Sequence, residues 1–146
     1  MWGDQLSVPS RALVLRVKPG EELISRIREE CVRAGIKAGI ITGIGSLKTA
    51  KIGFLERTPP PEFREMEIDG PLELMFVGNV TEEREGVRIH LHATVSKGEK
   101  TFFGHLFNGE IFTTAEVFVI SLEGVRITRK LDESTGLEEI DIDERK

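Results

Sequence analysis

The sequence predicts an α+β domain in which a mainly antiparallel sheet of about seven strands packs with one main helix. Three observations predict this fold class. The 146 residues, of which 39% are hydrophobic and 31% charged, suffice for one domain with a single core. Only residues 21–34 carry an extended helical periodicity. The other apolar runs are short, β-prone and separated by Gly, Pro and Asn turn signals.

The N-terminal part is expected to contain one strand and the helix. Residues 1–9 have no periodicity and predict a loose terminus before a folded domain over 10–131. Residues 11–17 are apolar-rich and predict the first strand. The helix is expected over 21–34, with acidic residues at its positive end and Gly35 as its C-cap. Its apolar stripe consists of Leu23, Ile24, Ile27, Cys31 and Val32.

The middle of the chain predicts further strands. Residues 36–47 form an apolar run in which Gly43 and Gly45 indicate a bulge or a close backbone approach, at a pocket wall or a subunit contact. Residues 50–56 predict another short strand, 58–61 an exposed loop and 69–71 a turn. Residues 72–80 predict a well-buried strand that carries one carboxylate, Glu73.

All three histidines fall in one predicted hairpin. Residues 87–96 alternate strictly between apolar and polar side chains, which is typical of a half-buried strand, and a second β-prone run follows at 101–107. A two-residue type II′ turn at Gly98-Glu99 would place His92 opposite His105 and His90 opposite Phe107. The three imidazoles would then share one face, whereas a register shift of one residue would move His105 to the other face.

Three neutral imidazoles with an open fourth position are the ligand set of a catalytic-type zinc site, and they also suit copper, nickel or iron. The alternative is that these histidines are ordinary surface or hydrogen-bonded residues. The pattern His-x-His in a strand favours the metal site, because side chains two residues apart lie on the same face.

The C-terminal part predicts strands over 115–122 and 125–131, followed by an acidic tail over 132–146. This tail holds seven acidic and two basic residues and accounts for the net charge of −5. Arg126, Arg129 and Lys130 form a basic face on the last strand. The pI of about 5.3 argues against direct nucleic-acid binding. A single cysteine, no predicted transmembrane segment and no signal peptide predict a cytoplasmic protein, and the abundance of Lys, Arg and Glu leans towards a thermophile.

Several short motifs, in a shared order, resemble the "plants and prokaryotes conserved" (PPC) domain. The matching segments are Gly43-Ile44-Gly45-Ser46-Leu47 with Ala50 and Gly53, Gly70-Pro71-Leu72-Glu73-Leu74 with Gly78-Asn79, His90-Leu91-His92-Ala93, Gly104-His105-Leu106, and Thr114-Ala115-Glu116-Val117. The resemblance implies a compact α+β fold that assembles as a homotrimer. It also implies a metal, commonly zinc, on His90, His92 and His105, as in prokaryotic members. The chain lacks the Arg-Gly-Arg-Pro segment of plant members, which inserts into the minor groove of DNA.

Three functions compete on these observations. The first is a metal-binding trimer, with hydrolase or lyase activity, in which Glu73 and Glu116 are candidate catalytic bases or partners of the metal ligands. Each carboxylate could equally form an interface ion pair or be the outward residue of a half-exposed strand. The second function is a non-catalytic, transcription-associated module that binds DNA or a protein. The third is a small-molecule sensor whose pocket wall includes residues 43–46.

Overall fold

The computed structural model, which describes residues 4–144, contains seven strands and one helix, as the sequence predicted. The predictions made for residues 1–3 and 145–146 lie outside the described residues. The elements are β1 (Val8–Val17), α1 (Leu23–Ala34), β2 (Gly39–Arg57), β3 (Glu62–Glu82), β4 (Val87–Lys97), β5 (Lys100–Glu123), β6 (Val125–Asp132) and β7 (Leu137–Glu144). No described helix has the length and apolar composition needed to cross a bilayer.

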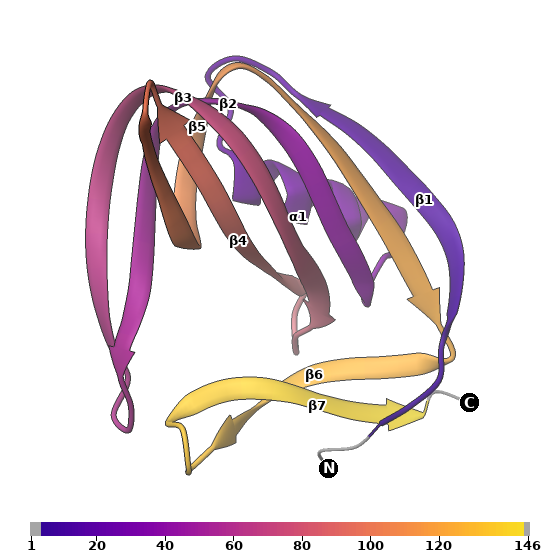
Figure 1. The fold of residues 1–146 in the computed structure, drawn as a ribbon. Helices are drawn as coiled ribbons and strands as arrows, with labels where there is room; N and C mark the ends of the chain where they lie inside the picture. Colours follow the sequence, from indigo (N-terminus) through magenta and orange to yellow (C-terminus); the bar gives the residue numbers. More distant parts are fainter. Residues whose placement is uncertain (1–3, 145–146) are drawn as a thin grey trace.

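The main sheet is antiparallel and almost closed on itself. Its strand order is β1-β5-β2-β3-β4, and the first part of β5 also pairs with β4, so that β2 to β5 form a ring with β1 outside it. The strands arch around α1, and β6 and β7 form a separate two-stranded sheet across one end (Figure 1). We call the side of the main sheet that faces α1 its inner face, and the other side its outer face.

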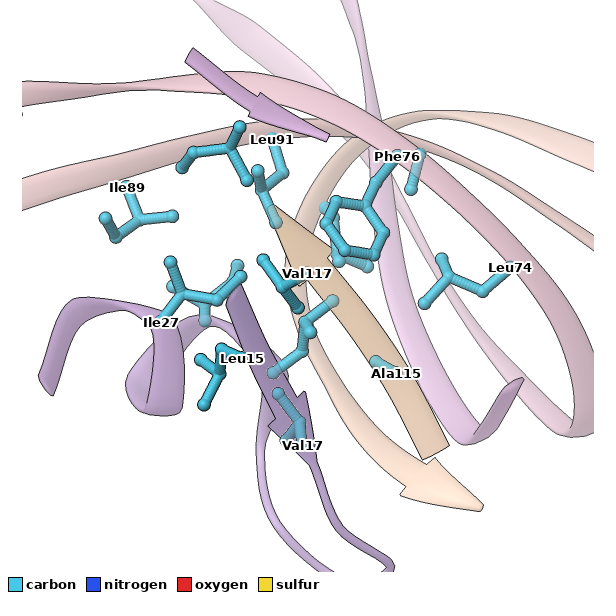
Figure 2. Packing of buried hydrophobic residues seen from close by; sticks show 14 of the residues in the cluster. Leu15, Val17, Ile27, Leu74, Phe76, Ile89, Leu91, Ala115 and Val117 are labelled. Carbon is cyan, nitrogen blue, oxygen red and sulfur yellow. The ribbon is translucent and has the colours of Figure 1, made fainter. Parts of the chain in front are cut away.

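Alternating residues of the main sheet form the core on the inner face. Figure 2 shows side chains from β1, β3, β4 and β5 gathered in one cluster with Ile27 of α1: Leu15, Val17, Leu74, Phe76, Ile89, Leu91, Ala115 and Val117. Burying one large aliphatic or aromatic side chain stabilises a fold by about 1.5–3 kcal/mol. This core fixes which face each neighbouring residue points to, because side chains alternate along a strand.

The helix begins and ends close to the predicted residues. The Glu22 carboxylate accepts hydrogen bonds from the backbone N–H groups of Ile24 (3.0 Å) and Ser25 (2.9 Å), and Gly35 ends the helix in the left-handed conformation at φ 71°. The prediction for Val32 is wrong, because its side chain is 54% exposed. At 3.6 residues per turn, Val32 lies about 140° around the axis from Ile27, outside the buried stripe.

The long β2–β3 hairpin corrects two predictions. β2 is one continuous strand instead of two, and residues 69–71 lie within β3 instead of forming a turn. A register shift opposite these residues, between Leu47 and Thr49, absorbs the irregularity. The predicted close approach is confirmed, because a Cβ atom on Gly43 or Gly45 would overlap backbone atoms of β5.

The segment expected to be an acidic tail is structured. β7 pairs with β6 through residues 137–144, and oppositely charged side chains face each other at Arg126↔Asp143 and Lys130↔Glu139. Such cross-strand pairs contribute about 0.2–1 kcal/mol each. The N-terminal strand is also longer than predicted, since β1 begins at Val8.

Candidate metal centre

The β4–β5 hairpin has the register that the sequence predicted. Gly98 has φ 60°, as a type II′ turn requires, Lys97 pairs with Lys100, and His92 pairs with His105. The ladder between β4 and β5 ends at this histidine pair, so the predicted pairing of His90 with Phe107 does not occur. His90 pairs with Asn79 of β3, and the ladder between β5 and β2 is irregular at Phe107.

The three histidines converge on the outer face of the sheet. Their ligand nitrogens all lie within 4.8 Å of one another. The ring centroid of His90 is 5.1 Å from those of His92 and His105, and the other two centroids are 5.9 Å apart. His92 is exposed and the other two are partly buried, so the cluster is open on one side. The core determines this convergence. Leu91 and Ala93, the two neighbours of His92 in β4, are buried on the inner face, so His90 and His92 point outwards.

This donor set fits a transition metal. Nitrogens bound to a tetrahedral zinc ion at about 2.0–2.1 Å lie about 3.3–3.4 Å apart, so small side-chain rotations would bring these three to bonding distance. Three imidazoles leave one coordination position for an external ligand. Imidazole nitrogens also suit copper, nickel and iron, so the geometry does not select one metal.

The local electrostatics keep two of the ligands neutral. Burial lowers the pKa of His90 to about 4, and the Arg129 guanidinium adds to this shift. Burial and, to a smaller extent, His92 lower the pKa of His105. A metal binds the neutral imidazole, so at neutral pH protons compete little for these two nitrogens.

A cavity of about 830 Å³ lies over the histidines. Its walls come from the β4–β5 hairpin, the end of the β2–β3 hairpin and the β6–β7 hairpin, and they include Phe54, Leu55, Phe63, Phe103, Leu131 and Leu137. The ends of the β2–β3 and β6–β7 hairpins meet: a Cβ atom on Gly136 would lie 3.0 Å from Cδ of Pro61. Figure 1 shows these two ends side by side. The histidine cluster therefore opens into a mostly apolar chamber of the size that small-molecule sites have.

Arg129 of β6 brings a positive charge to the histidines. Its Nη2 donates to Oδ1 of Asn79 (3.0 Å) and lies 3.3 Å from Nδ1 of His90. Its Nη1 donates to the backbone oxygen of Glu138 (3.4 Å), and its Nε donates to Oγ1 of Thr81 (3.4 Å). All these partners are neutral, and within residues 4–144 no carboxylate forms an ion pair with Arg129.

Arg88, the second arginine that lines the cavity, has its charge balanced by two carboxylates. Its Nε donates to Glu83 (2.7 Å) and its Nη2 donates to Glu138 (3.0 Å). The contact with Glu138 joins β4 to β7. Arg88 therefore helps to hold the β6–β7 hairpin over the three histidines.

Glu73 and Glu116, the predicted catalytic carboxylates, do not line the cavity with the histidines. Glu73 is exposed and pairs with Ser96, four residues and therefore about 13 Å along β4 from His92. It lines a smaller hollow of about 440 Å³ together with Ser46, the one residue of the suggested 43–46 pocket wall found there. Glu116 is exposed in β5, paired with Arg16 and Ile44. Both are outward residues of half-exposed strands, the alternative that the sequence offered.

The sequence did not identify the residues that β6 and β7 contribute to the cavity. Arg129, Leu131, Leu137, Glu138 and Glu139 all line it. Two signals were present: the alternation of acidic and apolar residues over 139–143, and the opposite charges of the segments on either side of residue 132. Taken alone, the basic segment predicts a last strand and the acidic segment a tail; only the two together predict that they pair.

The outer face also carries an uncovered apolar surface, which we call the apolar patch. It consists of Val14, Ile40, Ile44, Met75, Val77, Phe118 and Ile120, each 38–68% exposed. The strand register brings these residues together, since Val14 and Thr42 both pair with Phe118, and Ile40 pairs with Ile120. A contiguous apolar surface of this kind typically marks an interaction site.

Comparisons with known proteins agree with this structure. The family model of the Plants and Prokaryotes Conserved (PCC) domain matches residues 7–123. A metal-containing protein from Archaeoglobus fulgidus is 32% identical, with 92% of this chain and 95% of that chain covered and a TM-score of 0.86. A plant- and prokaryote-conserved protein from Pyrococcus horikoshii is 34% identical, with 93% and 94% covered and a TM-score of 0.85.

Two more distant matches are informative about the fold and the extent of the similarity. A protein from Bacteroides thetaiotaomicron, described as a candidate DNA-binding protein, shares the fold at 22% identity, with 94% of this chain and 98% of that chain covered and a TM-score of 0.80. A bifunctional protein GlmU from Synechococcus is 28% identical over 136 residues, which are 91% of this chain and 21% of that protein. The chain thus spans about a fifth of the length of the curated relatives that it matches.

Proposed function

The chain belongs to the Plants and Prokaryotes Conserved domain family, and from that premise we propose that it is a metal-binding homotrimer that acts on a small molecule. In this proposal His90, His92 and His105 hold zinc or another transition metal. The single observation that carries the proposal is the convergence of three ligand nitrogens within 4.8 Å at the floor of a cavity of about 830 Å³. A purely structural metal site would have a fourth protein ligand.

The proposed activity is hydrolysis or a lyase reaction. When bound, the metal would supply a Lewis acid that polarises a carbonyl or phosphoryl oxygen. The chain's own residues have three tasks. The three imidazoles would hold the metal, and the lowered pKa values of His90 and His105 keep these two rings in the neutral form that binds it. The apolar walls would keep water from the ligand, and the contact of Arg88 with Glu138 keeps the β6–β7 wall in place.

Elemental analysis tests the metal site. The purified chain is compared with the triple variant His90→Ala, His92→Ala, His105→Ala and with Ser96→Ala, a matched control on the same strand and face. We expect close to one transition metal per chain in the wild type and the control, and none in the triple variant. Metal-free wild-type protein after incubation with zinc would overturn the proposal, whereas stoichiometric metal would justify a screen for hydrolysis.

The apolar patch is the proposed contact between subunits of the trimer. Val14, Ile44 and Phe118 are exposed in a single chain and would be buried by a second copy. Light scattering coupled to gel filtration tests this assembly. We expect trimers for the wild type and monomers for Ile44→Lys. Val32→Lys is the matched control because it changes an exposed aliphatic residue of α1 outside the patch. A monomeric wild type would contradict this part of the proposal.

The alternative is a non-catalytic module that binds DNA or a protein in transcription. The net charge of −5 disfavours direct DNA binding, because affinity for DNA comes largely from positive side chains on phosphates. Fluorescence anisotropy with a labelled duplex at low salt distinguishes the alternatives. Binding that weakens steeply with added salt would support the DNA-binding module, and no binding at low salt would exclude it.

A further inference from the structure

The arginine beside the metal ligands points to the kind of molecule that the cavity receives. Arg129 reaches His90 from the β6–β7 hairpin, beyond the part of the chain that the family model matches. Its described partners are an amide oxygen, a hydroxyl, a backbone oxygen and an imidazole nitrogen. Each is neutral, so the positive charge of Arg129 is not balanced by a carboxylate in direct contact.

Metal binding would change what Arg129 can bond to. A neutral imidazole has one nitrogen that carries a proton and one that offers a lone pair. Nδ1 of His90, 3.3 Å from Nη2 of Arg129, can accept a hydrogen bond only while that lone pair is on Nδ1. A metal on either nitrogen of His90 uses the single lone pair. The hydrogen bond from Arg129 to His90 is therefore incompatible with a bound metal, and metal loading would free an N–H of Arg129 beside His90.

We propose that this released N–H makes Arg129 the recognition residue for a carboxylate, and that the cavity binds a small organic acid through the metal and Arg129 together. This inference rests on the proposed metal-dependent function and names its ligand class. A carboxylate has two oxygens and can be shared between a metal and a guanidinium, whose planar fork matches it.

The charges and walls of the cavity favour a monoanion with an apolar body. Arg88 is ion-paired with Glu83 and Glu138, whereas within residues 4–144 Arg129 has no carboxylate at ion-pair distance and feels Glu138 and Glu139 only from further away. Glu139 lines the same cavity and adds negative charge, which disfavours a dianionic phosphate. Phe54, Phe63 and Phe103 present apolar surface to the rest of the ligand.

Titration of the cobalt(II)-loaded protein tests the inference, because the visible absorption of cobalt responds to a new ligand. The probe is 3-methylbutanoate, and its uncharged counterpart of similar shape is 3-methylbutanamide. The variants are Arg129→Gln, Arg129→Lys and Arg126→Gln. Arg126 is the matched control because it lies on the same strand, exposed and outside the cavity lining. Metal content and thermal unfolding are measured for every variant.

We expect the wild type to bind the carboxylate at least about 10-fold more tightly than the amide, since hydrogen bonds to charged groups are the strong ones. Arg129→Gln should keep one metal per chain and weaken carboxylate binding at least about 10-fold. Arg129→Lys should weaken it less, because lysine keeps the charge and loses the fork. Arg126→Gln should change it less than about 2-fold. Binding of the carboxylate and of cobalt should be linked in the wild type. The factor by which the carboxylate raises the affinity for cobalt should equal the factor by which cobalt raises the affinity for the carboxylate.

The outcomes separate this inference from the proposed function. A wild type that holds no metal overturns both. Metal-loaded wild type that does not distinguish the carboxylate from the amide, or that binds the carboxylate as tightly as Arg129→Gln does, overturns only the role of Arg129. If Arg129→Gln does not fold, Arg129→Lys decides, since unchanged affinity in that variant would contradict recognition by the guanidinium fork.

Discussion

Two hairpins enclose the candidate metal centre, and they are built on different physical principles. The β4–β5 hairpin belongs to the main sheet: Leu91, Ala93 and Val95 on its inner face are fully buried in the core, and the histidines alternate with them. The β6–β7 hairpin has no comparable apolar face; it is stabilised by cross-strand charges and by polar contacts of Arg88 and Arg129. The first lies within the family segment 7–123 and the second beyond it. The histidine-bearing hairpin is thus fixed by the core, whereas the wall that covers it depends on surface contacts.

Metal affinity should show the largest difference between the two hairpins. We expect His105→Ala to weaken zinc binding by more than the roughly 10–100-fold that loss of an outer-shell partner costs, because a ligand itself is lost. Glu138→Gln, which breaks the contact between β7 and Arg88, should change affinity less than about 3-fold. Competition with a chromophoric chelator measures both. Equal losses would mean that the β6–β7 hairpin helps to build the metal site.

The second largest difference between the two hairpins should be in their contribution to the free energy of unfolding. Leu91→Ala removes a fully buried side chain of β4 and should lower the free energy of unfolding by about 2–5 kcal/mol. Leu131→Ala changes a 57% exposed leucine of β6 and should cost less than about 0.5 kcal/mol. Urea denaturation of the metal-free protein gives both values. A cost above 2 kcal/mol for Leu131→Ala would show that the second hairpin has a core of its own.

Acidification should destabilise the metal-free protein through the first hairpin. The pKa of His90 is lowered to about 4, so between the usual histidine pKa of 6.5 and about 4 the unfolded chain binds a proton that the folded chain does not. Stability should therefore fall as the pH drops through this range and level off below it. The lowered pKa of His105 acts in the same direction.

Urea denaturation at pH 7.5 and pH 5 measures this loss. The control is His90→Gln, which should lose less stability over the same interval. Glu30 and Asp132, whose pKa values are lowered by hydrogen bonds from Arg26 and Ser134 respectively, contribute only at lower pH. An identical loss in the wild type and His90→Gln would contradict the burial of a neutral His90.

The contact between the ends of the β2–β3 and β6–β7 hairpins should make the smallest contribution to stability. Gly124 and Gly136 both have positive φ (81° and 73°), so alanine at either position should cost about 1–2 kcal/mol of backbone strain. A Cβ atom at Gly124 meets nothing within 4 Å, whereas at Gly136 it lies 3.0 Å from Pro61. Gly136→Ala should therefore cost slightly more than Gly124→Ala and increase hydrogen exchange near residues 59–61. Equal costs and exchange would show that the contact is not important.

The convergence of the three histidines could be predicted because its causes are local. The alternation around His90 and His92 and the glycine at the turn determine the face and the register, and no distant residue is needed. The position of Arg129 depends on a separate contact. It reaches the histidines only because β6 lies against β3, near Asn79 and Thr81, and that packing joins segments about 50 residues apart. Charge patterning indicated that β6 and β7 could pair, and gave no indication of where the pair would lie.

The error at residues 69–71 has a similar origin, and so does the position of Glu73 and Glu116 away from the cavity. Residues 69–71 contain turn residues, and the local signal was overruled by the pairing of β3 with β2 on both sides of them. A carboxylate within an apolar run, such as Glu73 or Glu116, is compatible both with a functional residue and with an outward residue of a half-buried strand. Alternation predicts which face of a strand a residue lies on, and it does not predict how far along the sheet Glu73 and Glu116 lie from the histidines.

The course of β5 has a consequence for how the chain emerges from the ribosome. β5 holds β1 on one side, β2 on the other and β4 at its beginning, so the sheet has no complete form before β5 is synthesised. Leu13 pairs with Val119, and at about 5–20 residues per second the partner of β1 is made roughly 5–20 s later. During that interval β1, α1 and the β2–β3 hairpin have apolar faces and no closed core. We expect the nascent chain to depend on chaperones that shield these faces until residue 123 has left the ribosome.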